Sequence, residues 1–82
     1  MAVVILQSDF ARRHTGGQTT LEVNASDYGS LLAVLDRRYP GLAVSLGVGM
    51  AVAIDGEIFP TPLLQAVGPD SEVHFLPVIG GG

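Results

Sequence analysis

The sequence of 82 residues contains no cysteine and no lysine, and it has no long hydrophobic run. Without cysteine the chain can form neither disulfide cross-links nor a cysteine-based zinc site, so its stability must come from packing. The first apolar stretch, residues 3–6, is too short for a signal peptide or a membrane span, and Asp9 follows it closely. We therefore expect a cytoplasmic protein without a membrane partner.

Positive charge is scarce as well. All four cations are arginines, and eight acidic residues bring the net charge to −4. No basic stripe is present to displace counterions from phosphates, which disfavours a nucleic-acid partner. The absence of lysine removes most amines that could react with an activated acyl group at the chain's own C-terminus. A preference for arginine in a GC-rich genome explains the same composition equally well.

The chain also lacks the usual motifs of an enzyme. His14 and His74 are far apart in sequence, and no Ser-His-Asp spacing, glycine-rich phosphate loop or acidic metal cluster is present. An isolated histidine is more often a surface residue than a metal ligand. A chain this short also has little room for a deep active site. We expect a protein that is not an enzyme and binds no cofactor or metal of its own.

What the sequence does contain is a series of strand patterns. Residues 2–7 form a β-branched run, and residues 19–23 alternate apolar and polar side chains. These two segments are expected to pair as a hairpin through a turn at residues 8–17. Further strands are predicted at residues 50–54, 57–59 and 72–77, with Asp55-Gly56 as a tight turn between the first two.

One clear helix separates the first two strands from the others. Ser26 or Asp27 can cap its N-terminus, and Tyr39-Pro40-Gly41 ends it. Its apolar stripe at helical spacing consists of Leu31, Leu32, Val34 and Leu35. Residues 42–49 contain two glycines and are expected to form a loop or a broken turn.

The resulting order, β-β-α-β-β-β, is that of the β-grasp, or ubiquitin-like, fold in the α+β class. We expect a single domain over residues 1–82, with a mixed four- to five-stranded sheet and one main helix packed on one face. A flexible C-terminal tail is expected at residues 78–82. In this fold the last strand pairs in parallel with the first, in the middle of the sheet. Another two-layer α+β domain with different strand pairing is the alternative.

The C-terminus is the most unusual feature of the chain. Gly80, Gly81 and Gly82 follow directly after an apolar stretch that includes Val78 and Ile79. A frayed end is the simplest explanation, because chain termini are usually mobile. A tail that enters a narrow channel in a partner explains both the glycines and the apolar residues before them. Residues 78–82, fully extended, would reach roughly 17 Å from the domain at about 3.3–3.6 Å per residue.

Over essentially its whole length the chain resembles the MoaD/ThiS family of ubiquitin-like sulfur carriers. The matching segments are VVIL, RRHTGGQ, SLLAVLDRRYPG, VAIDGEI and the ending DSEVHFLPVIGGG, which is the most specific of them. The RRHTGGQ segment looks especially similar to the carrier that supplies sulfur for cysteine synthesis.

This resemblance implies that the protein is a co-substrate of other enzymes. A separate E1-like adenylating enzyme would use ATP to activate the Gly82 carboxylate, and a sulfur donor would convert it into a thiocarboxylate. Gly80 and Gly81 would give access to the terminus. A downstream synthase would take the sulfur for cysteine, molybdopterin, thiamine or a specialised metabolite. The alternatives are a ubiquitin-like modifier joined through Gly82 to lysines, and a non-catalytic interaction domain.

Partner recognition is expected to use apolar residues near the tail. The candidates are Phe59, Phe75, Leu76, Val78 and Ile79. Strand alternation leaves a second interpretation open, in which Phe75 and Val73 face the helix as part of the core.

Overall fold

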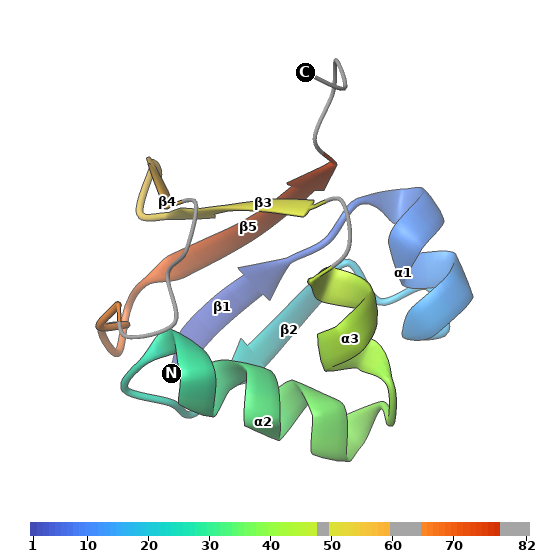
Figure 1. Ribbon diagram of the computed structural model, residues 1–82, viewed down its shortest axis with the longest axis horizontal. Helices are drawn as coiled ribbons and strands as arrows, with labels where there is room; N and C mark the ends of the chain where they lie inside the picture. Colours follow the sequence, from blue (N-terminus) through green and yellow to red (C-terminus); the bar gives the residue numbers. More distant parts are fainter. Residues whose placement is uncertain (48–49, 60–64, 78–82) are drawn as a thin grey trace.

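The computed structural model describes residues 1–47, 50–59 and 65–77. Within them a single mixed sheet has the strand order β2-β1-β5-β3-β4 (Figure 1). The strands are β1 (Ala2–Ile5), β2 (Thr20–Val23), β3 (Met50–Ile54), β4 (Glu57–Phe59) and β5 (Glu72–Pro77). The helices are α1 (Ser8–His14), α2 (Tyr28–Arg38) and α3 (Leu42–Leu46).

The pairing of the first and last strands is as predicted. β5 lies in the middle of the sheet, parallel to β1 on one side and antiparallel to β3 on the other. The β1–β2 and β3–β4 pairs are antiparallel. The parallel register places Val3 opposite Glu72 and Ile5 opposite His74. β5 is paired with β1 only over residues 72–74, so its last three residues, which precede residues 78–82, are paired with β3 alone.

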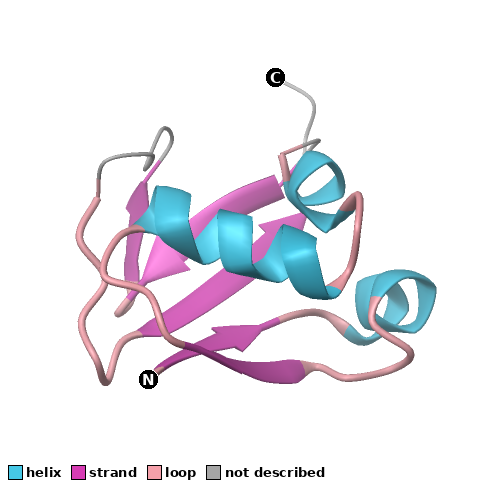
Figure 2. Cartoon of the chain, turned by 90° about the horizontal axis from the view of Figure 1, so that it is seen from below, coloured by secondary structure: helices cyan, strands magenta, loops and turns pink. Residues whose placement is uncertain are grey.

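The core lies between the sheet and the helices, and α2 and α3 pack on the same face of the sheet (Figure 2). Leu31 and Leu35 of α2 are fully buried, as are Val4 of β1 and Val73 of β5. Burying one such side chain contributes about 1.5–3 kcal/mol, so these contacts hold the helical layer on the sheet.

The predicted limits of the main helix are confirmed. The side chain of Asp27 caps α2 by accepting a hydrogen bond from the backbone N–H of Ser30 at 2.7 Å. That bond, together with the Ser30 side chain, lowers the pKa of Asp27 from its ordinary value of 3.8. At the other end the helix stops at Arg38, and Gly41 adopts a φ of 93°, which favours glycine.

Two short helices were not predicted. Residues 8–17 were expected to form only a turn, but α1 occupies most of them because Phe10 and Ala11 are buried in the core. Residues 42–49 were expected to form a loop or a broken turn, but α3 lies there with Leu42 and Leu46 buried. The single predicted helix is therefore the longest of the three helices that the described residues form.

Candidate functional site

The expected working part of the molecule begins at the end of β5. Pro77, the last residue of that strand, is in register with Met50 of β3. The predicted tail, including Gly80, Gly81 and Gly82, lies outside the described residues, as do the docking candidates Val78 and Ile79. What the structure describes is the surface around the point from which these residues leave the domain.

One face of the sheet is left uncovered by the helices of the described chain. Because side chains alternate along a strand, Glu72, His74 and Leu76 point away from the helices, while the residues between them are buried. His74 lies in a row that crosses all five strands in register, formed by Thr20, Ile5, His74, Ala53 and Ile58. We call this face, with Val3, Ala51, Glu72 and Leu76, the open face.

The open face carries apolar side chains from several strands. Ile58 is 63% exposed and Leu76 is 39% exposed, while Val3 and Ile5 are half-buried. Neither Ile58 nor the β1 residues were predicted as docking candidates. The signal for Ile58 was available, because a two-residue Asp-Gly turn places Ala53 opposite Ile58 and so puts both on one face.

Two of the predicted docking residues face the other way. Phe75 is 1% exposed and packs against Tyr28 of α2, with the ring centroids 6.0 Å apart. The proposed docking role of Phe75 is thereby corrected, and the interpretation of Phe75 and Val73 as core residues is the one that the structure supports. Phe59, in register with Val52, is half-buried against the edge of the same core. Among the predicted residues that are described, Leu76 alone lies on the open face.

A depression of about 550 Å³ lies at the other end of the open face. It is lined by Ala53, Asp55, Gly56, Asp70, Glu72, His74 and Leu76. Glu72 and His74 contact each other there, with Oε1 and Nε2 3.2 Å apart. Acidic side chains therefore border the apolar part of the open face on the side away from the tail.

Asp55 in that depression has a structural role. It adopts a left-handed conformation with a φ of 51°, and its carboxylate accepts hydrogen bonds from the Glu72 N–H at 2.9 Å and the Ser71 hydroxyl at 2.8 Å. These bonds, the backbone one first, lower the pKa of Asp55 from 3.8. The Ser71 hydroxyl in turn accepts from the N–H of Gly68. The β3–β4 turn is thus tied to the start of β5.

A second hollow, of about 450 Å³, lies at the end of the sheet on the side of the helices. Its lining comes from four elements and consists of Phe10, Arg13, His14, Val44, Ser45, Met50 and Pro77. Since Pro77 is part of its wall, this hollow borders the start of the tail. We call it the tail-root hollow.

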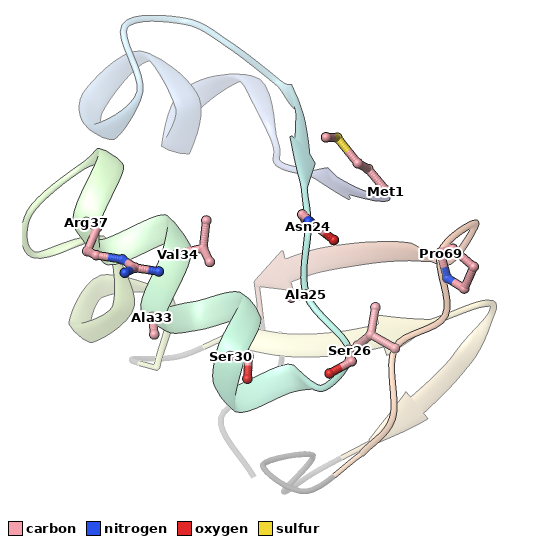
Figure 3. A pocket seen from close by; sticks show the side chains of 10 residues that line it. Met1, Asn24, Ala25, Ser26, Ser30, Ala33, Val34, Arg37 and Pro69 are labelled. Carbon is pink, nitrogen blue, oxygen red and sulfur yellow. The ribbon is translucent and has the colours of Figure 1, made fainter.

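A larger hollow of about 580 Å³ lies away from the tail. Figure 3 shows it between α2, the β2–α2 connection and the loop before β5, with Arg37 as its one charged side chain. Met1 and Pro69, which border it, lie just before the parallel strands β1 and β5. The hollow is therefore at the start of these strands, and the tail follows the end of β5. Nothing in its lining suggests a reaction or a specific ligand.

In residues 1–47, 50–59 and 65–77, no three side chains among His, Cys, Asp and Glu come together as a metal site would require. None of the helices described has the length and apolar character needed to cross a bilayer.

The RRHTGGQ segment is explained largely by local structure. The hydroxyl of Thr15 lies within hydrogen-bond distance of the carbonyls of Ala11 and Gln18, and Gly16 and Gly17 both have positive φ. The side chain of Gln18 accepts a hydrogen bond from the Tyr39 hydroxyl at 2.9 Å. The segment therefore ends α1 and ties it to α2, and its similarity to one subfamily does not by itself identify a pathway.

Comparison with known proteins places this geometry in a family context. The model of the ThiS family matches residues 8–82. Among the curated proteins no significant sequence match is found.

Three solved structures share the fold. CysO of Mycobacterium tuberculosis, described as an antigen, has a TM-score of 0.85 at 21% identity, over 96% of this chain and all (100%) of its own. A chain of the BexX/CysO complex of Amycolatopsis orientalis also has a TM-score of 0.85 at 21% identity, over 100% of both chains. Small archaeal modifier protein 1 of Methanosarcina acetivorans has a TM-score of 0.79 at 18% identity, over 99% and 95% of the two chains. The predicted β-grasp fold is confirmed.

Proposed function

Because the chain belongs to the ThiS family, we propose that it is a sulfur carrier whose reactive group is the carboxylate of Gly82. The observation that carries the proposal is the match of the family model, which extends through the three glycines to residue 82. The placement of β5 supports it, since the pairing of Pro77 with Met50 of β3 holds the residue that precedes the tail. The carrier supplies a recognisable surface and an accessible terminus, and a separate enzyme supplies the catalysis.

The proposed chemistry has two steps on that enzyme. A carboxylate oxygen of Gly82 attacks the α-phosphate of ATP, pyrophosphate leaves, and an acyl-adenylate forms. A sulfide-level donor then attacks the carbonyl carbon, the C–O bond to AMP breaks, and a thiocarboxylate remains. Activation is needed because the oxygen of a free carboxylate is a poor leaving group, whereas AMP is a good one.

We assign recognition by the adenylating enzyme to the open face. Leu76 lies near the end of β5, and Ile5 and Ile58 lie on the same face in the row of His74. Exposed apolar side chains such as Ile58 and Leu76 mark docking sites. A downstream synthase that takes the sulfur is the second partner in this proposal. Such a synthase would use the sulfur to make cysteine, molybdopterin, thiamine or a specialised metabolite.

Intact-mass measurement tests the proposal directly. The purified chain is incubated with its cognate adenylating enzyme, ATP and sulfide, and we expect the mass gain produced by replacing one oxygen with sulfur. A reaction without ATP is the control and leaves the mass unchanged. If the complete mixture yields only the free carboxylate, the proposal is wrong.

A modifier is the second candidate function, because one of the proteins with the same fold is named a small archaeal modifier protein. Such a protein would be joined through Gly82 to amines of other proteins. Proteomic digestion of the native host would then show Gly-Gly remnants on the lysines of other proteins. Thiocarboxylate without such remnants favours the carrier.

A further inference from the structure

The net charge differs between two parts of this protein, although Asp9 and Asp36 lie among the arginines of α1 and α2. Four carboxylates lie at the end formed by the β3–β4 turn and the start of β5, namely Asp55, Glu57, Asp70 and Glu72. All four arginines of the chain lie instead on α1 and α2, in the last turn of each helix. Figure 1 shows the β3–β4 turn and α1 at opposite sides of the molecule, with the end of β5 on the side of α1.

Arg13 is the cation that borders the tail-root hollow. Arg12, its neighbour, forms an ion pair with Asp9, but Arg13 has no such partner within the described part of the chain. His14 lies beside it, with its ring 4.3 Å from the ring of Phe10. The hollow therefore combines apolar walls with an exposed guanidinium whose charge is available to an incoming group.

If Gly82 is activated by an adenylating enzyme, that enzyme must contact the surface around the tail-root hollow. Residues 78–82 reach roughly 17 Å from Pro77 when fully extended, at about 3.3–3.6 Å per residue. An enzyme that takes Gly82 into its active site must therefore bring the entrance of that site against the surface around Pro77. Leu76 lies on the open face, and Met50, in register with Pro77, lies in the tail-root hollow. The two surfaces lie on opposite sides of the sheet, and both lie next to the end of β5 at Pro77.

We propose that the tail-root hollow is a second docking surface, and that its occupant is an acidic, partly apolar region beside the active-site entrance of the adenylating enzyme. This inference rests on the proposed function. A carboxylate of the enzyme pairs with Arg13, and an apolar side chain covers Val44, which is 71% exposed. Because the other end of the carrier is acidic, it repels the same region of the enzyme. The charge separation thus orients the carrier with its tail toward the entrance.

Charge reversal at Arg13 tests this docking surface, and the chain offers a matched control. Arg13 and Arg38 are both exposed, and both lie in the last turn of a helix, but Arg38 is on α2 and does not line the tail-root hollow. With Arg13→Glu we expect kcat/KM for thiocarboxylate formation to fall about tenfold at low salt. The rate at saturating carrier stays unchanged, and the loss shrinks as salt is added. Arg13→Lys keeps the charge and retains most of the activity.

Arg38→Glu changes the net charge by the same amount and should alter kcat/KM little. Equal effects of the two reversals would mean that only net charge matters, and no effect of Arg13→Glu would also overturn the inference. A second variant, Val44→Glu, places a negative charge in the hollow without touching α1 and should weaken docking as well. The melting temperature of each variant is measured to confirm that it folds.

Calorimetric binding of the carrier to the enzyme separates the two proposals. If the wild-type chain binds, and Arg13→Glu weakens binding while Arg38→Glu does not, the docking surface stands even if no thiocarboxylate forms. If thiocarboxylate forms equally well with Arg13→Glu, the carrier function stands and the docking surface is wrong. If the wild-type chain neither binds nor reacts, both proposals are wrong.

Discussion

Phe75 and Leu76 are neighbours on β5, yet Phe75 is 1% exposed and Leu76 is 39% exposed. The same alternation runs through the sheet, so that one face carries the side chains that hold the helices. The other face carries apolar side chains that no helix of the described residues covers. The covered face accounts for the stability of the domain. The open face leads to the start of the tail, and its apolar residues are explained by a partner rather than by folding.

The change that should most clearly separate stability from carrier function is a deletion in the tail. Deleting Gly81 and Gly82 removes the proposed reactive carboxylate and shortens the reach of the terminus, so thiocarboxylate formation should be abolished. The core lies within residues 2–75, so the melting temperature should change little. Mass spectrometry and thermal unfolding measure the two quantities. Loss of folding on this deletion would show that the tail is structural.

The next largest effect distinguishes the two faces of β5. Phe75→Ala removes a fully buried ring and should lower the free energy of unfolding by about 3–5 kcal/mol. Leu76→Ala removes a partly exposed side chain and should lower it by only about 0.5 kcal/mol. Denaturant unfolding measures both. Comparable losses would mean that the open face is itself part of the packed core.

The sequence predicts some of these elements and faces better than others. The pattern of residues 72–77 predicts a strand with the same limits as β5, because its apolar and polar residues alternate clearly. The N-cap at Asp27 and the stop at residues 39–41 are equally local signals, and both are confirmed. Elements whose limits depend on residues close by in the sequence can therefore be predicted from the sequence.

The two short helices and the faces of some residues could not be predicted in the same way. α1 has only Phe10 and Ala11 buried, adjacent positions that form no helical repeat, so its existence depends on the core it packs into. The N-terminus of α3 is held by Asp36, whose carboxylate accepts hydrogen bonds from the N–H groups of Gly41 and Ala43. Phe59 was predicted as a docking residue and Ile58 was not, whereas strand register places Ile58 opposite Ala53 on the open face and Phe59 opposite buried Val52.

A smaller effect is expected from a charge placed on the open face. Ile58→Asp puts a carboxylate on the edge strand β4 of the proposed docking surface, where it would have to be desolvated on binding. We expect kcat/KM for adenylation to fall at least about tenfold, with little change in the melting temperature because Ile58 is exposed. Ala33→Asp on the outer side of α2 is the matched control and should leave adenylation unchanged. Equal loss in both variants would contradict docking through the open face.

The smallest effect concerns the turn at the acidic end of the open face. Hydrogen bonds hold the pKa of Asp55 below 3.8, so ionised Asp55 stabilises the fold above that pH. The contribution is lost as the pH falls through the lowered, folded-state pKa. Asp55→Asn tolerates the left-handed backbone but carries no charge, so its melting temperature should be lower than that of the wild type at neutral pH.

The pH dependence of that difference distinguishes charge from shape. The gap between the wild type and Asp55→Asn should narrow as the pH falls from 3.8 through the lowered folded-state pKa, because the carboxyl group of the unfolded chain binds its proton first. Asp70→Asn removes a charge from the same depression, without the hydrogen bonds that hold Asp55, and should show a much smaller gap throughout. A gap that stays constant with pH would mean that the shape of the turn, and not the ionised carboxylate, ties β3 and β4 to the start of β5. In either case the acidic end of the open face would stabilise the sheet, and recognition would depend on its apolar part beside the tail.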